Sequence, residues 1–375
     1  MGKPLMQIDQ PSLQVEINSY RVGWNMVWAT MFPLKYTQKF DIHGLVGNDG
    51  IPVAADKVAF NSKAPQKGRK TVGSWSGTLG KISVSREKNE MEINEYNDAL
   101  VLAAKNEDAA AARDLVNSVY DDVQFAHDAL DARLEIDGCE IACSGIATKA
   151  SVQDGDNTTA DIIDFNIPEK QKVGVKKPWS SLGDGGAIVP NADADGIGNI
   201  IAGYKLVKKA GKLAPKYVYI HADAFELMQA QPATATRLFP NVSNPAMITA
   251  EQLTLEGINA YMRRNGYPEL LVIDPLINEE DKNGNIKPVN PYNVNVLCFS
   301  VSPQLGWTYY KTVPKVQGTD NIESYGAYYK ITVAGYTDPM LEKTIGEAYV
   351  QQGLINRGSM VLMNVNANKW NNGAR

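Results

Sequence analysis

The chain has few of the residues that build metal centres and disulfide frameworks. Its 375 residues include only three cysteines and three histidines. Three cysteines cannot form a disulfide framework, and so few soft ligands disfavour a zinc enzyme. The formal charge of −5 at pH 7 gives no bulk electrostatic reason for tight nucleic-acid binding. The composition therefore argues against a secreted disulfide protein, a zinc enzyme and a basic nucleic-acid binder.

Long apolar runs and targeting signals are also absent from the sequence. The most apolar early tract, residues 22–34, is interrupted by Asn25 and Thr30 and stopped by Pro33. A membrane-spanning helix would need about 18 or more consecutive apolar residues. The N-terminus has no basic segment followed by an apolar region, which a signal peptide requires. We therefore expect an intracellular, reducing environment and no membrane partner.

The charges that are present are segregated along the chain. Residues 57–86 contain seven basic residues and no acid, whereas residues 87–137 carry a net charge of −10. These blocks could be solvated faces, which is the common explanation of charge runs. The alternative hypothesis is that the basic segment of one copy lies on the acidic surface of a neighbour. The residues it assigns to contacts between subunits are Lys63, Lys67, Arg69, Lys70, Trp75, Asp121, Asp122 and Asp128.

The basic block lies in a glycine-rich region that cannot form a core of its own. Between residues 61 and 80 the large apolar side chains are Val72, Trp75 and Leu79. Such a segment is either a mobile loop or an arm that rests on another molecule. The alternating patterns at 81–85 and 91–94 predict exposed two-stranded β structure.

The acidic block contains the clearest helix in the sequence. Apolar residues recur at helical spacing at positions 115, 119, 123, 126, 130 and 134. Glu107 and Asp108 fit a first turn, and the pattern predicts a helix over about 107–145 with a length on the order of 55 Å. Gly138 weakens the pattern locally. A long helix with a single apolar stripe is expected to act as a spine against which other elements pack.

Residues 191–300 alternate between helix and strand patterns. Helices are predicted over 197–209 and from a capping box at 249–252 to Arg264. Strands are predicted at 217–220, 270–273 and 294–299, followed by later strands at 328–333 and 360–365. This order is typical of a compact α/β unit with a β-rich tail.

No catalytic, cofactor or metal site emerges from the motifs. Asp193 and Asp195 are interpreted as a helix N-terminus, and residues 281–285 as a hairpin tip, because neither has the later ligands of a calcium loop. No phosphate-binding loop is present. Cys139 and Cys143 are interpreted as core residues. The three histidines, at 43, 127 and 221, are not in a recognisable nucleophile motif.

The order of the segments resembles a known family. The matching pieces are Met31-Phe32-Pro33, the arm at 46–80, the strand at 82–96, Arg133-Leu134-Glu135, Cys143-Ser144-Gly145, Trp179 with 193–200, and Asp338-Pro339. In this order the chain resembles the major capsid proteins of tailed bacteriophages, with the Hong-Kong-type capsid fold. Within that group it most resembles the lambda-type major capsid family.

The resemblance implies an α+β fold with five parts. They are an N-terminal arm (1–40), an extended loop, or E-loop, with its return strand (41–95), a peripheral domain with a spine helix (96–185), an α/β axial domain (186–310), and a return to the peripheral domain with C-terminal strands (311–375).

The function that the resemblance implies is a non-enzymatic shell subunit. Hexamers and pentamers of the chain would form an icosahedral head that encloses a DNA genome without binding it tightly. Expected partners are a scaffold, a portal and decoration proteins, in the virion and in the host cytoplasm during assembly. Alternatives are an encapsulin-like compartment of the same fold, a tail or portal component, and a carboxylate-based enzyme with its site in 191–300.

Overall fold

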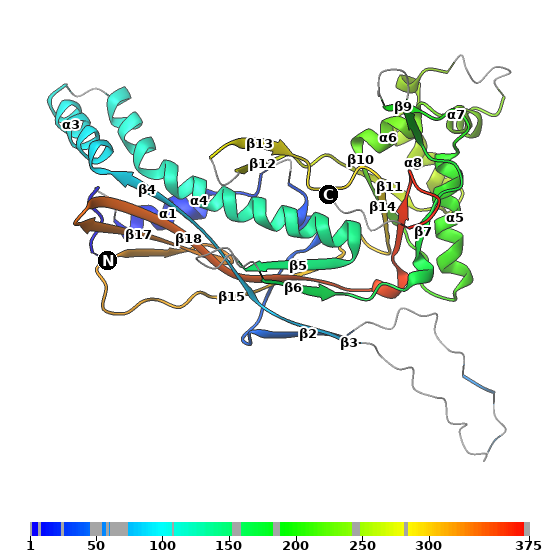
Figure 1. Ribbon diagram of the computed structural model, residues 1–375, viewed down its shortest axis with the longest axis horizontal. Helices are drawn as coiled ribbons and strands as arrows, with labels where there is room; N and C mark the ends of the chain where they lie inside the picture. The colour runs from blue at the N-terminus through cyan, green and yellow to red at the C-terminus, as the bar shows by residue number, and fades with distance from the viewer. Residues whose placement is uncertain are drawn as a thin grey trace.

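The computed structural model places a long helix along an extended sheet, with a helix-covered second sheet at one end (Figure 1). It describes residues 2–6, 9–23, 26–45, 55–57, 60, 74–106, 109–151, 159–182, 188–241, 248–280 and 284–370. Helices and strands both contribute substantially, so the α+β class expected from the sequence is confirmed.

The larger sheet forms the elongated body of the molecule. Its six strands are β1 (Leu34–Tyr36), β15 (Gly306–Lys311), β18 (Met340–Leu354), β17 (Tyr329–Thr337), β16 (Ile322–Tyr325) and, paired with β18, β4 (Gly80–Asn89). β18 is the central strand, because it pairs antiparallel with β15, β17 and β4.

The long helix α4 (Ala109–Ser144) packs its apolar stripe onto this sheet. Val123, Ala126 and Leu130 are buried together with Ile331 of β17 and Ala348 of β18. Gly138 also has a packing reason. A Cβ there would lie 3.3 Å from the Gln352 side chain and 3.4 Å from the Phe32 ring, so glycine allows the helix to approach closely.

The second sheet is covered by helices on one face and by the body on the other. Its order is β11 (Glu269–Ile273), β10 (Tyr217–His221), β14 (Val296–Ser300), β19 (Val361–Asn364) and β7 (Lys172–Gly174). One face buries Val218 and Phe299 under helices, and the other buries Tyr219 and Cys298 against the body. The covering helices are α5 (Gly196–Lys209), α6 (Ala222–Gln229), α7 (Pro232–Leu238) and α8 (Leu255–Arg264).

Shorter elements complete the chain. Among the described residues, four two-stranded antiparallel pairs are β2 (Asp41–Leu45) with β3 (Ser74–Thr78), β5 (Ile146–Ser151) with β6 (Thr159–Asp164), β8 (Ser180–Leu182) with β9 (Ile188–Pro190), and β12 (Ile277–Glu280) with β13 (Ile286–Val289). The remaining helices are α1 (Gln10–Ser19), α2 (Trp28–Met31), α3 (Glu90–Asn106), and the 3-10 turns η1 (Glu169–Gln171), η4 (Ala250–Gln252) and η5 (Arg357–Ser359).

The structure corrects the strand predictions at 91–94 and 82–96. The strand β4 ends at Asn89, and the helix α3 begins directly after it at Glu90, so residues 91–94 are helical. Asn89 and Glu92 form a reciprocal cap: the Glu92 N–H donates to Asn89 Oδ1 at 3.1 Å, and the Asn89 N–H donates to Glu92 Oε2 at 2.7 Å. A capping box of this kind starts a helix whatever the alternation that follows.

Two features of the α/β unit also differ from expectation. The N-cap of α8 is Thr254, whose hydroxyl accepts from the Gly257 N–H at 3.1 Å, and residues 250–252 form a separate 3-10 turn. The sheet also recruits β7 and β19 from outside the 191–300 range, so the unit is not continuous in sequence. The helix predicted at 197–209 is confirmed as α5. Strands β12 and β13, which flank the hairpin tip predicted at 281–285, pair antiparallel, and residues 281–283 lie outside the described residues.

Candidate assembly interface

The aspartates assigned to the acidic surface fall into two groups. Asp122 is only 7% exposed, and its carboxylate lies 3.2 Å from Lys88 Nζ and 3.6 Å from Arg86 of the same chain. The Arg86 guanidinium also lies 3.7 Å from the centre of the Phe125 ring. Asp122 therefore links α4 to β4 through ion pairs within the same chain. Asp121 and Asp128 are exposed on α4 and retain access to another molecule.

Trp75 also has an intramolecular role. It is 5% exposed, and its indole N–H donates to the Leu354 carbonyl at 3.1 Å. Its ring meets Phe165 edge-on, with centroids 5.1 Å apart, and lies near Tyr309. Since Trp75 belongs to β3, it anchors the base of the glycine-rich arm in the core of its own chain. The prediction had placed this side chain at a contact between subunits, whereas the structure buries it in its own chain.

The basic residues assigned to the arm, Lys63, Lys67, Arg69 and Lys70, lie outside the described residues. The described base of the arm is the β2–β3 hairpin, in which Ile42 pairs with Gly77. The hairpin lies below the body, away from α3 (Figure 1).

A buried polar stripe on α4, which the sequence pattern alone did not reveal, anchors the N-terminal segment. Glu135 is fully buried, and its Oε2 accepts from the backbone N–H groups of Val27 at 2.9 Å and Trp28 at 2.7 Å. These donors belong to the start of α2, where a carboxylate complements the free N–H groups. Burial raises the pKa of Glu135, although both hydrogen bonds oppose the rise.

One and two turns earlier, the same stripe continues with Asp131 and His127. Asp131 is 1% exposed and accepts from the Tyr328 hydroxyl at 2.6 Å, while burial raises its pKa. The His127 ring contacts Tyr20, with centroids 5.1 Å apart, and Tyr329, with centroids 5.4 Å apart. The signal in the sequence was the i, i+4 spacing of 127, 131 and 135 beside the apolar stripe.

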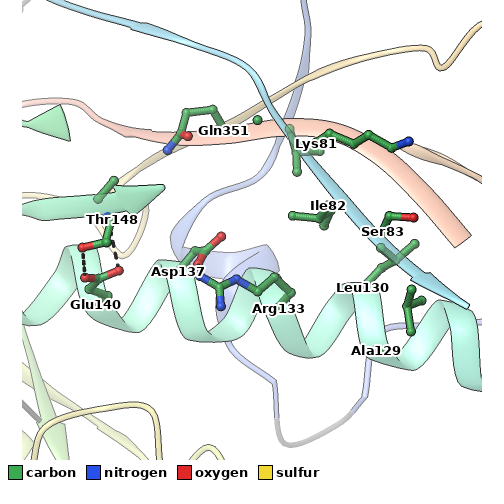
Figure 2. Close-up of a pocket in the computed structure, with 14 residues that line it drawn as sticks. Lys81, Ile82, Ser83, Ala129, Leu130, Arg133, Asp137, Glu140, Thr148 and Gln351 are labelled. Atoms are coloured by element: carbon green, nitrogen blue, oxygen red, sulfur yellow. Dashed lines mark hydrogen bonds and ion pairs between the residues drawn. The ribbon is translucent and has the colours of Figure 1, made fainter. Parts of the chain in front are cut away.

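A cavity of about 670 Å³ lies between α4, β4, β5 and β18. Figure 2 shows Arg133 and Asp137 meeting on the α4 side, with Glu140 turned toward Thr148. Arg133 lies 2.7 Å from Asp137, and the Thr148 hydroxyl donates to Glu140 at 2.6 Å. Burial raises the pKa of Asp137 to about 6, against the opposing effect of Arg133. The carboxylates of Asp137 and Glu140 in this cavity are already bound to groups of the same chain.

The expected structural roles of the aspartates in 191–300 are supported by their contacts. Asp195 Oδ1 accepts from the Gly198 N–H at 2.8 Å and caps α5. Burial alone would raise its pKa, but hydrogen bonds from Arg237 and Gly198 lower it. Asp193 is exposed and lies 3.4 Å from Lys177. His221 caps α6, since its Nδ1 accepts from the Asp223 N–H at 3.0 Å.

The three cysteines are buried and free of disulfide bonds. Within the described part of the chain, no group of three or more His, Cys, Asp or Glu side chains could hold a metal ion. Among the helices that the structure describes, none combines the length and the apolar character needed to cross a bilayer.

Two solved structures share the arrangement of a long helix across an extended sheet with an α/β unit at one end. A phage-related protein from Bordetella bronchiseptica RB50 is 11% identical, covers 96% of this chain and 98% of its own, and has a TM-score of 0.52. A prophage protein of Escherichia coli CFT073, assigned as a capsid protein, is 13% identical and has a TM-score of 0.52. That match covers 96% of this chain and 99% of the prophage protein. No protein-family model and no curated protein sequence matches the chain. The chain therefore has the tailed-phage capsid fold expected from the sequence.

Proposed function

We propose that this chain is the major capsid protein of a tailed bacteriophage, a structural subunit that assembles into the shell around the genome. The observation that carries the proposal is the match of fold over nearly the whole chain, 96% of its length, to a prophage protein assigned as a capsid protein. The match also covers 99% of that protein, so the two chains correspond over nearly their whole lengths.

The charge pattern suggests one of the contacts between copies. Asp121 and Asp128 remain exposed on α4. The basic residues Lys63, Lys67, Arg69 and Lys70 lie in the sequence between β2 and β3. In the proposed shell the arm of one copy lies on α4 of the next, where opposite charges fix orientation. We exclude Trp75 and Asp122 from this proposed surface, because both side chains are buried in their own chain.

The five-part division at 1–40, 41–95, 96–185, 186–310 and 311–375 remains part of the proposal. So do hexamers and pentamers, a scaffold, a portal and decoration proteins, and assembly in the host cytoplasm before residence in the virion. The enclosed DNA is held without tight, specific contacts, in keeping with the net charge of −5.

Electron microscopy of the purified full-length chain tests the proposal. We expect closed particles tens of nanometres across, formed alone or with a scaffold protein. Open tubes or single rings would favour a tail or portal component instead. A chain that remains monomeric at every concentration and with its scaffold would refute the proposal.

A further inference from the structure

The α/β unit separates its charges onto opposite ends of its sheet. Strands β10 and β11 are parallel, and α5 and α8 each end shortly before one of them begins. The C-terminal turns of both helices therefore lie at the end of the sheet where these strands start. The ring centroids of Tyr204 and Tyr267 lie 5.8 Å apart, which places the ends of α5 and α8 side by side.

Basic side chains dominate this end, which we call the basic edge. Its members are Lys205, Lys208, Lys209, Lys212, Lys216, Arg263 and Arg264. Arg263 has a weak partner in Glu269, 3.9 Å away. No carboxylate of a described residue is within 4.0 Å of the other six.

Acidic side chains dominate the opposite end, where β10 and β11 stop. This acidic edge contains Asp223, Glu226, Glu251, Glu256 and Asp274. In Figure 1 it lies beside α6 and β9, across the unit from the lower end of α5. Asp223 and Asp274 lie 3.7 Å and 3.8 Å from the His221 ring nitrogens, and no Lys or Arg of the described residues pairs with any of the five.

The acidic edge is also hollowed and partly apolar. A cavity of about 830 Å³ is lined by Ile188, Leu227 and Val294 together with the carboxylates of Glu226 and Glu251. Ile188 is 70% exposed. On the basic edge, Leu213 is 42% exposed between two lysines, so each edge presents apolar surface within a charged rim.

Stabilisation of helix dipoles does not account for the whole pattern. It favours acids in the first turn of a helix and bases in the last turn, and its effect falls off beyond those turns. Lys212 and Lys216 lie beyond the end of α5, and Glu226 lies in the middle of α6. These charges have no partner of opposite sign among the described residues of the unit that would explain their position.

We propose that the basic edge of one copy binds the acidic edge of the next copy, head to tail, with Leu213 directed toward the apolar cavity. A contact between two different patches of the same chain generates a ring when the rotation closes. The inference rests on the proposed shell function and names the surfaces that would join copies within a ring. Opposite charges would set orientation, and the apolar side chains would contribute burial.

Charge reversal in the full-length chain tests this contact. One variant carries Glu226→Lys and Glu251→Lys, a second carries Lys209→Glu and Lys216→Glu, and a third carries all four changes and keeps the net charge of the parent. Sedimentation velocity over a range of protein concentrations measures association. We expect each two-site variant to need about 100-fold more protein to associate, because like charges then face each other. The four-site variant, whose edges are complementary again, should return close to the parent.

Matched controls separate edge charge from total charge. One control variant carries Lys39→Glu and Lys315→Glu, which reverse the charge of two exposed basic residues. The other carries Glu95→Lys and Glu280→Lys, which reverse the charge of two exposed acidic residues. All four positions lie outside the two edges. We expect both controls to associate like the parent, and thermal unfolding should confirm that every variant folds.

The outcomes distinguish this contact from the shell function itself. If the parent forms shells and both edge variants do so equally well, the head-to-tail contact is wrong and the proposed function stands. The contact is also wrong if the four-site change fails to restore association. A parent that never associates refutes both. Loss of binding to a DNA duplex in the basic-edge variant, with normal assembly, would instead identify that edge as a phosphate-binding surface and overturn the inference.

Discussion

Acidic side chains serve different purposes in the long-helix body and in the α/β unit. On α4, Glu135, Asp131 and Asp122 are buried and bound to groups of their own chain. In the α/β unit, Glu226 and Glu251 are exposed at one end of the sheet. Burying a charge is costly unless hydrogen bonds or ions compensate it, so the acids of the body stabilise the fold. Exposed carboxylates have no desolvation cost in the folded chain, and they remain accessible to a partner.

The largest effect should come from removing the most deeply buried of these carboxylates. Glu135→Ala deletes two charge-assisted hydrogen bonds and leaves the buried N–H groups of Val27 and Trp28 without an acceptor. We expect the free energy of unfolding to fall by about 3 kcal/mol. Glu226→Ala, the matched change on the acidic edge, should alter it by less than about 0.5 kcal/mol. Urea unfolding of both variants measures the difference.

Glu135→Gln sharpens this result, because the amide keeps one acceptor oxygen in place. It should unfold at a urea concentration between those of the parent and Glu135→Ala. Equal losses for Glu135→Ala and Glu226→Ala would mean that the two regions do not differ in the way the contacts indicate.

A smaller effect is expected at two neighbouring aspartates within the body. Asp122→Ala removes the partner of Lys88, whose side chain is only 14% exposed, and should lower the free energy of unfolding by about 1 kcal/mol. Asp121→Ala should leave it unchanged within about 0.5 kcal/mol but weaken association if α4 receives the arm of a neighbour. Thermal unfolding and sedimentation of the same two proteins separate these roles. If Asp121→Ala lowered the free energy of unfolding and Asp122→Ala weakened association, the assignment of Asp121 to the interface would be wrong.

The smallest effect concerns pH. Because burial raises the pKa of Asp137 to about 6, the folded chain holds this proton at pH values where the unfolded chain has lost it. Stability must therefore fall as the pH rises from about 4 toward 7. Its side chain is 24% exposed, so we expect a loss of about 1 kcal/mol relative to Asp137→Asn, which cannot titrate. Melting curves of both proteins at pH 4, 5, 6 and 7 check this; a constant difference would contradict it.

Local patterns accounted for much of the fold. The spacing of apolar residues indicated the long helix, and the α5 range followed from its start and end signals. The error at 91–94 arose because alternation over four residues is weaker than the Asn89–Glu92 cap that precedes it. Trp75 and Asp122 were assigned to a surface because their burial depends on β18 and β4, which lie far away in sequence.

The sequence by itself determined the long helix, the alternation of helix and strand in the α/β unit, and the segregation of charge along the chain, because these follow from residue type and spacing. The α+β class came from the resemblance that the order of these segments carries. Only the tertiary structure decided which charges face inward and which remain in water. By running β10 and β11 parallel, it placed Lys216 and Arg264 at the same end of the sheet. It also placed Glu226 and Glu251 along one cavity. The physical reason is that burial and charge pairing depend on packing between distant segments, which a pattern along the chain does not record.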